Sequence, residues 1–479
     1  MKSLLSLLAL VGPLLAVEQS DYYNTHTYEL PQGLSLEASG LAVLPDGKLA
    51  IGIRRGEVWI VADPTNDKPA FKKFASGMHE VLGLAYHDGA LYATQRSEVT
   101  RLRDTNNDGV ADEYITAASG WGVSGNYHEY AYGPVFDNEG NMHNTLNASM
   151  GKGWEGAGEE AKTPLWRGWS VMTDRNGKTR GFSAGFRSPC GIGLNDEGDI
   201  FVTDQQGNWM ATNPLFHVRD GAFFGHADAL KDIKGSKVKD PGKLPDGITV
   251  AEAITKVPGY CPPAVWFPYV KMGQSPTGLH CDTTGGKFGP FAKQLFVGEF
   301  VMSGVNRVFL EKIGGEYQGA CFPFVSGLQS ASLSVNFLAD GSLVVGQSNR
   351  GWNSMGNRPH GLQRIVWTGK TPLEVLKMEL IDKGFRFTFT LPVDPSSLGD
   401  INASSYTYAY TAKYGGPEIN TQQLTIGSAK LSADGLSLEV KCAPLRIGHV
   451  HEFELPELKA KDGTPLWHRM TYYTLNRLK

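Results

Sequence analysis

The stretch GIGLNDEGDIFVTD, from Gly191 to Asp204, decides the fold because it reads as one complete β-hairpin. Two apolar runs flank an acidic, glycine-containing turn, and such turns between alternating apolar residues are a strong hairpin signal. The same pattern returns as GLAVLPDGKLAIGIRRGEVWIV from Gly40, GLAYHDGALYATQRSEVTRL from Gly83, GPVFDNEGNMHNTL from Gly133 and VNFLADGSLVVGQS from Val335. A looser copy begins at Leu279. The chain therefore repeats one supersecondary unit.

Six such units between about residues 36 and 370 predict an all-β fold, a six-bladed β-propeller over residues 22–369. A sandwich fits less well, since its strands would not recur as hairpin units. The last repeat strand, in GLQRIVWTG, is expected to pair with the early segment HTYELP and close the ring. Closure would remove two sheet edges that otherwise invite aggregation.

The pattern changes after Gly369, where alternating strands with Pro and Asp-Gly punctuation run to the C-terminus. About seven short strands in this region predict a small Ig-like β-sandwich over residues 370–479. It contains few candidate catalytic groups, so we expect an accessory role.

The composition and the termini narrow the function classes. A net charge of −4 without any Lys/Arg-rich run argues against a nucleic-acid partner. Residues 1–16 read as a signal peptide, and no later apolar run could span a bilayer, so we expect a periplasmic or secreted protein. The five cysteines form no CxxC pair, which disfavours a zinc ribbon. A Cys261–Cys281 disulfide and buried free thiols are both compatible with this spacing.

Three polar loops directly precede the first strand of their repeat units: GNYHEYAYGP, GFRSPCG and GQSPTG. Equivalent positions in successive blades should face one axial mouth, so these loops predict a shared site. His128 is the candidate acid or base, with a packed histidine as the alternative. Arg187 could clamp an anion or stabilise developing negative charge, with a structural ion pair between blades as the alternative.

A second group of candidates follows the inner strands of the fourth unit. Gln205, Gln206, Asn208 and Trp209 place an aromatic ring among amides, which suits a sugar that stacks on the ring and bonds the amides. The alternative is a tryptophan that packs within its loop. His226, in GAFFGHADAL, is a further candidate for substrate contact, with turn packing as the alternative.

The segment RDTNNDGVADEY resembles a calcium-binding loop, with acidic and amide side chains around a glycine at the sharp turn. Its candidate ligands are Asp104, Asn106, Asp108 and Asp112. Ile115 stands where the bidentate glutamate is expected. Both a bound Ca²⁺ ion, which would brace the connection between blades, and an Asx-rich turn remain open.

The repeats and the segments GFRSPCGIGLNDEGDIFVTDQQGNW, FHVRDGAFFGH and SPTGLHCDTTGGKFGPF resemble the soluble glucose/sorbosone dehydrogenase family of propellers. More closely, they look like exported dehydrogenase-type propellers of Planctomycetes and Verrucomicrobia, over nearly the whole chain. The resemblance implies oxidation of an aldose with pyrroloquinoline quinone (PQQ) and calcium, and an external electron acceptor. It would make His128 the base and Arg187 a quinone contact, with the backbone of Gln206 and Gly207 near the calcium ion and Asn208 beside them.

Three departures from the family pattern concern the quinone. Ser188 replaces the usual asparagine, Met302 and Ser303 stand in the region of a quinone-binding lysine, and SASLSVNFLADG lacks two arginines. The leading hypothesis is an exported sugar-acting oxidoreductase. The alternatives are a propeller lyase or hydrolase on glycans without a redox cofactor, and a carbohydrate- or protein-binding propeller without catalysis.

Overall fold

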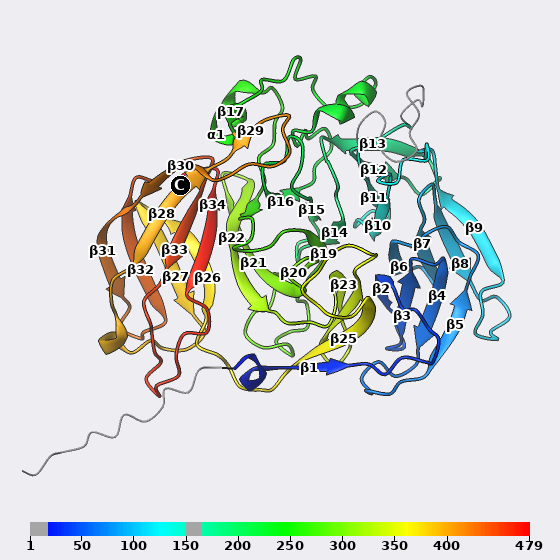
Figure 1. The fold of residues 1–479 in the computed structure, drawn as a ribbon, viewed down its shortest axis with the longest axis horizontal. Coiled ribbons are helices and arrows are strands. Elements are labelled where there is room, and N and C mark those ends of the chain that lie inside the picture. The colour runs from blue at the N-terminus through cyan, green and yellow to red at the C-terminus, as the bar shows by residue number, and fades with distance from the viewer. Residues whose placement is uncertain (1–17, 150–163) are drawn as a thin grey trace, which may run out of the picture.

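A computed structural model describes residues 18–149 and 164–479, so the signal peptide expected over residues 1–16 lies outside the described residues. The described chain is almost entirely antiparallel β-structure (Figure 1). Helices are short and lie in connections: α1 (Val250–Lys256) and the 3-10 helices η1 (Gln19–Asp21), η2 (Ala227–Asp232) and η3 (Pro395–Ser397). In these two ranges no helix is long and apolar enough to cross a membrane.

Each repeat unit forms the start of one antiparallel sheet. The first two sheets contain β2 (Ala38–Val43), β3 (Leu49–Ile53), β4 (Glu57–Val61) and β5 (Phe71–Ala75), then β6 (Gly83–His87), β7 (Ala90–Thr94), β8 (Val99–Arg103) and β9 (Glu113–Ala118). The next two contain β10 (Ala131–Phe136), β11 (Met142–Leu146), β12 (Trp169–Thr173) and β13 (Thr179–Ala184), then β14 (Gly191–Leu194), β15 (Ile200–Thr203), β16 (Asn213–His217) and β18 (Val265–Phe267).

The last two repeat units begin a fifth and a sixth sheet. These contain β19 (Pro276–Cys281), β20 (Leu295–Glu299), β21 (Gly304–Ile313) and β22 (Glu316–Val325), then β23 (Ser332–Phe337), β24 (Leu343–Ser348), β25 (His360–Trp367) and β1 (Tyr23–Thr27). The first strands β2, β6, β10, β14, β19 and β23 follow one another round a central axis, and β23 returns to β2. The architecture is therefore propeller-like.

Glycines in the first strands let neighbouring backbones approach closely. A methyl group on Gly83 would lie 1.8 Å from the carbonyl oxygen of Gly133, and one on Gly191 would lie 2.0 Å from that of Thr277. A methyl group on Gly278 would lie 2.8 Å from the Leu333 carbonyl oxygen. Packed interiors do not accommodate such overlaps without moving backbone. The glycine that opens several repeats is thus required by the packing of the ring.

The predicted pairing of the last repeat strand with the N-terminal segment is confirmed. Strand β1 lies antiparallel to β25, with Tyr23 opposite Trp367 and Thr27 opposite Gln363. The pairing starts three residues before the segment HTYELP, where Tyr23 is buried and its hydroxyl donates to the Phe288 carbonyl at 3.0 Å. The N-terminal strand is therefore fixed by burial as well as by backbone hydrogen bonds.

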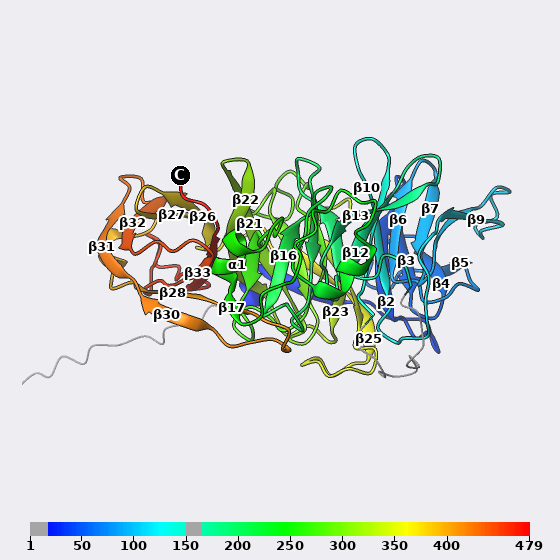
Figure 2. The ribbon, with the colours of Figure 1, turned by 90° about the horizontal axis from the view of Figure 1, so that it is seen from above.

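The C-terminal strands form a sheet of their own and extend the fifth sheet (Figures 1 and 2). The separate sheet contains β26 (Val375–Ile381), β27 (Gly384–Phe389), β32 (Ser437–Ala443) and β31 (Thr425–Leu431). The extension contains β34 (Met470–Leu475), β33 (His449–Glu454), β28 (Asn402–Thr407) and β30 (Ile419–Gln423). Phe387, Val440 and Phe453 belong to the apolar core shared by both sheets.

Two strand pairings join the C-terminal region to the ring. Strand β34 pairs with β22, with Ala320 opposite Tyr473. Strand β17 (Ile248–Thr249) pairs with β29 (Ala409–Tyr410) near the first residues of α1. The region is thus attached along continuous β-structure, and its loops lie close to those of the fourth sheet.

Substitution of Gly83 tests the packing of the ring. We expect Gly83→Ala to lower the free energy of unfolding by about 3 kcal/mol, because the new methyl group would meet the Gly133 carbonyl. Gly427→Ala is the matched control, since its methyl group would meet its nearest neighbour only at 3.7 Å. Urea unfolding of both variants measures the difference, and equal stabilities would contradict the packing argument.

Candidate functional site

Loops at one end of the ring enclose a cavity of about 430 Å³, within the range of small-molecule sites. Its walls come from loops that precede first strands and from loops that follow second strands. The first group contributes His128, Arg187, Ser188, Gln274 and Ser275, and the second contributes Gln205, Gln206, Phe300, Val301, Arg350, Trp352 and Asn353. The three loops expected to share a site do line this one cavity.

The floor of the cavity separates it from the central channel. Tyr132, Cys190 and Leu333 line both the cavity and a second space of about 540 Å³ between the first strands. All three are buried, and burial raises the pKa of the Cys190 thiol to about 11, so this thiol is protonated at neutral pH. The two spaces therefore share a wall of uncharged groups.

The turn that carries Arg187 is held by a buried carboxylate, Asp204. The Arg187 amide donates to Asp204 Oδ2 at 2.7 Å, and the amides of Ser188 and Gln205 donate to Oδ1 at 2.6 and 2.7 Å. Asp204 has no exposed surface, and its burial raises its pKa to about 6. One side chain therefore fixes the loops before β14 and after β15 together.

The side chain of Arg187 lies between the fourth sheet and the C-terminal region. A methyl group on Gly207 would lie 1.8 Å from Arg187 Nε, so the absence of a side chain there makes room for the guanidinium. The guanidinium carbon lies 5.1 Å from the centre of the Tyr414 ring, which also lines the cavity. Burial lowers the pKa of Arg187, which nonetheless stays far above neutral pH as for arginines generally.

His128 lies in a loop that is ordered by buried polar groups. Arg96 donates through Nη2 to the Asn126 carbonyl at 2.8 Å and forms an ion pair with Glu80 at 3.0 Å. Glu129 is fully buried and accepts hydrogen bonds from the Ser124 amide and hydroxyl. The imidazole lies at the cavity wall, 6.2 Å between ring centres from Trp352.

Arg350 is a cavity residue that the sequence reasoning missed. Its side chain is 7% exposed, its guanidinium stacks 4.3 Å from the Tyr130 ring centre, and Nη2 lies 3.8 Å from Glu80. Within the described residues its buried Nε and Nη2 atoms make no hydrogen bond. The signal was available, because Arg350 precedes a glycine after a second strand, as Gln206 does in the fourth unit. The site therefore contains two buried arginines.

Asn208 and Trp209 do not line the cavity, and their cofactor- and substrate-binding roles remain predictions. Asn208 Nδ2 donates to the Ala412 carbonyl at 2.8 Å, and the Trp209 amide donates to Thr411 at the same distance. The Trp209 ring packs 4.9 Å from that of Tyr410. Both residues instead attach the C-terminal loop to the fourth sheet. Gln205 and Gln206 do line the cavity, and their roles there remain predictions.

His226 is also absent from the cavity wall. It is 3% exposed, and Nδ1 accepts a hydrogen bond from the Asp228 amide as the cap of η2. Burial, together with the nearby charge of Arg187, lowers its pKa to about 3. His226 is thus a neutral, capped histidine outside the cavity wall, and its contact with substrate remains a prediction.

The predicted calcium loop is organised by internal hydrogen bonds. Asp104 accepts from the amides of Asp108 and Gly109, and Asp112 accepts from the amide and hydroxyl of Thr105. Asn106 accepts from the Asp108 amide at 2.9 Å. Across residues 18–149 and 164–479 no three acidic, histidine or cysteine side chains gather as a metal cluster. The geometry is that of an Asx-rich turn, and Ca²⁺ binding there remains a prediction.

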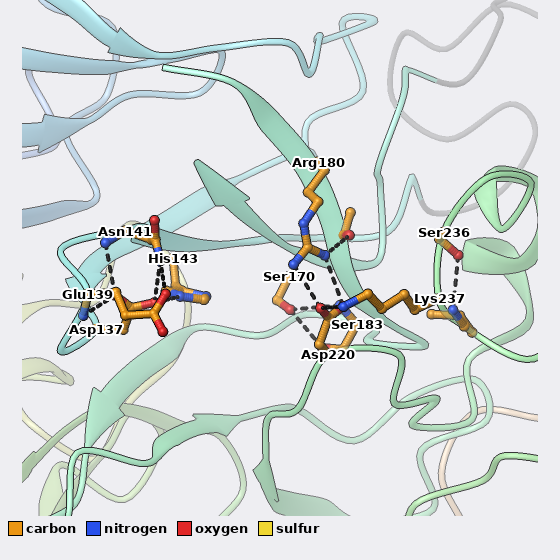
Figure 3. Close-up of polar contacts among 12 residues, drawn as sticks. Asp137, Glu139, Asn141, His143, Ser170, Arg180, Ser183, Asp220, Ser236 and Lys237 are labelled. Atoms are coloured by element: carbon orange, nitrogen blue, oxygen red, sulfur yellow. Dashed lines mark hydrogen bonds and ion pairs between the residues drawn. The ribbon is translucent and has the colours of Figure 1, made fainter. Parts of the chain in front are cut away.

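Figure 3 shows polar contacts at a turn of the third sheet and between this sheet and a neighbouring loop. Asp137 accepts from the turn amides of Glu139 and Asn141 and lies 3.0 Å from His143 Nε2. Asp220 pairs with Arg180 at 2.8 Å and with Lys237 at 2.7 Å. None of these side chains lines the cavity.

Comparison with known proteins supports the fold. A family model described as a domain of unknown function (DUF7133) matches residues 11–241, and no curated protein matches significantly. A glucose dehydrogenase crystal structure aligns with a TM-score of 0.51 at 16% identity, covering 71% of this chain and 99% of that one. A Trichoderma reesei protein of Carbohydrate-Active Enzymes Family AA12 aligns with a TM-score of 0.50 at 13% identity, covering 75% and 99%. The chain shares its propeller-like fold with these proteins.

The pH dependence of stability tests the role of Asp204. Its pKa is about 6 in the native protein and 3.8 for an unperturbed aspartate, so between these values the native state binds more protons than the unfolded state. Stability from this group therefore falls as pH rises through this window and is constant above it. We expect the unfolding free energy of wild type relative to Asp204→Asn to fall by about 2.4 kcal/mol from pH 4 to 7. Urea unfolding of both proteins at several pH values measures this difference in unfolding free energy. A difference that does not change with pH would contradict the raised pKa of Asp204.

Proposed function

We propose that the protein is a carbohydrate oxidoreductase that binds a carboxylate-bearing quinone in the 430 Å³ cavity. The observation that carries this proposal is the presence of two buried arginines, Arg187 and Arg350, in the wall that also presents His128. Within the described residues Arg350 Nε and Nη2 make no hydrogen bond; a buried guanidinium in this state is stabilised by an anion, and carboxylates match its planar donor geometry. The shared fold with a glucose dehydrogenase is consistent with this activity.

The residues present fit PQQ, although the cations are distributed differently from the family pattern. Arg350 supplies a cation that the segment before β23 lacks, and Arg187 supplies the other. Tyr130 and Tyr132 provide aromatic surface for a planar ring. A calcium ion at Gly207 fits less well, because that carbonyl already accepts hydrogen bonds from Met210 and Gly415.

The residues of the cavity wall would take separate roles in proton transfer and in ligand binding. His128 would take the proton from the sugar hydroxyl that is oxidised, since a neutral imidazole is a base near neutral pH. Arg187 and Arg350 would bind carboxylates and hold the ligand's orientation. A bound PQQ would supply the two-electron acceptor for the hydride that leaves the same carbon.

The wider expectations belong to the same proposal. Six sheets whose first strands form a closed ring support a six-bladed propeller over residues 22–369, and the paired C-terminal sheets support a sandwich over residues 370–479. We also propose export to a periplasm or the medium, with electrons passing to an external acceptor.

Titration with PQQ and Ca²⁺, followed by the quinone absorbance, tests the cofactor. We expect saturable binding at micromolar quinone, and Arg350→Ala should weaken it at least about tenfold because a buried carboxylate would lose its cation. Arg55→Ala is the control, since this arginine is 67% exposed and lies outside the cavity wall. Absence of binding to wild type would overturn the quinone assignment.

His128→Ala tests the proposed base. We expect the rate of dye-coupled oxidation of D-glucose and other aldoses to fall by about 100-fold or more, which is typical for loss of a general base. Quinone binding should be retained, because Arg187 and Arg350 are unchanged. An equal rate in the variant would remove His128 from the mechanism.

A further inference from the structure

Exposed aromatic side chains gather at the mouth of the candidate cavity. In the part of the chain that the structure describes, five Tyr or Trp side chains are classed with the exposed large apolar residues. Three of them line this cavity: Tyr269, Trp352 and Tyr414, with exposures of 42%, 51% and 65%. Their clustering is significant because exposed apolar surface that gathers at one place marks a binding surface.

The three rings come from separate parts of the chain. Tyr269 follows β18, Trp352 follows β24, and Tyr414 lies between β29 and β30 in the C-terminal region. We call Tyr269, Trp352 and Tyr414 together the aromatic collar. Because the collar is assembled from three loops, its shape depends on how each loop is held.

Tyr414 is held in place by the fourth sheet. The Gly415 amide donates to the Gly207 carbonyl at 3.0 Å, and the Gly416 amide donates to the Ala211 carbonyl at 3.0 Å. Asn208 and Trp209 add the two hydrogen bonds described above. A side chain that is 65% exposed is thus carried on a backbone that is fixed on both sides.

The other two rings are also carried on ordered turns. The Trp352 amide donates to the Asn349 carbonyl at 2.6 Å, and the Met355 amide donates to Val301 at 2.7 Å. The Val270 amide donates to the Gly273 carbonyl at 3.0 Å, which closes the turn after Tyr269. Preorganised rings bind a ligand with less loss of conformational entropy than mobile ones.

We propose that the substrate is an oligosaccharide or polysaccharide whose terminal sugar enters the cavity while the following sugars stack on the aromatic collar. Pyranose rings present apolar C–H faces that pack on Tyr and Trp rings, and their hydroxyls remain free for water. The cavity of about 430 Å³ would be filled by a quinone and one sugar ring, so the outward surfaces of the collar serve sugars outside it. Oxidation of the terminal sugar rests on the proposed function, whereas binding of the oligosaccharide does not.

Calorimetric titration without any cofactor tests the inference separately from the oxidation. The probes are cellohexaose, maltohexaose, xylohexaose and mannohexaose, each compared with its own monosaccharide. We expect at least one hexaose to bind at least tenfold more tightly than its monosaccharide. Failure of all four to do so would overturn the inference, whether or not the protein oxidises a monosaccharide.

Variants then test whether the tighter binding of a hexaose, compared with its monosaccharide, depends on the aromatic collar. Tyr414→Ala and Trp352→Ala should each weaken hexaose binding about fivefold, while Tyr414→Phe should retain it because the ring remains. Tyr114→Ala is the matched control, since Tyr114 is 44% exposed on β9 and does not line the cavity. Equal affinities of wild type, Tyr414→Ala and Trp352→Ala would overturn the collar even if a hexaose binds. Quinone binding in these variants reports separately on the proposed function.

Discussion

The close approach of backbones around the central axis is the constraint on which the rest of the structure depends. Where the first strands of neighbouring sheets meet, Gly83 and Gly191 face carbonyl groups at distances that no side chain allows. This tight ring brings the loops that precede the first strands to a common end. His128 and Arg187, 59 positions apart in the numbering, reach one cavity for that reason.

Hairpins and ring closure were predictable because both depend on local patterns. Acidic-glycine turns such as the one in Gly191–Asp204 specify antiparallel pairing directly, and β14 and β15 pair as expected. The pairing of β25 with the N-terminal strand was predictable because a closed ring leaves no exposed sheet edge. The connection of β34 to β22 was not, since nothing in either strand's sequence identifies which distant edge it joins.

Within the site, the sequence predicted the polar loops that precede the first strands. Which other residues line the cavity depends on tertiary packing. His226 and Trp209 were predicted as ligand contacts from residue type alone; in the structure one caps η2, the other supports the C-terminal loop, and neither lines the cavity. Tyr414 reaches the cavity from a region that the sequence suggested was accessory. Asp204 shows a further limit, because its role as the anchor of the Arg187 turn appears only when three amides are seen to converge on it.

The pairing of β1 with β25 has a consequence for biosynthesis. Thr25 is translated some 340 residues before its partner Ile365. Until then β1 has no mate, and an unpaired strand of this kind can recruit other chains. The ring therefore stays open while the residues between the two strands are translated, and over that interval β1 is exposed to pairing with other chains.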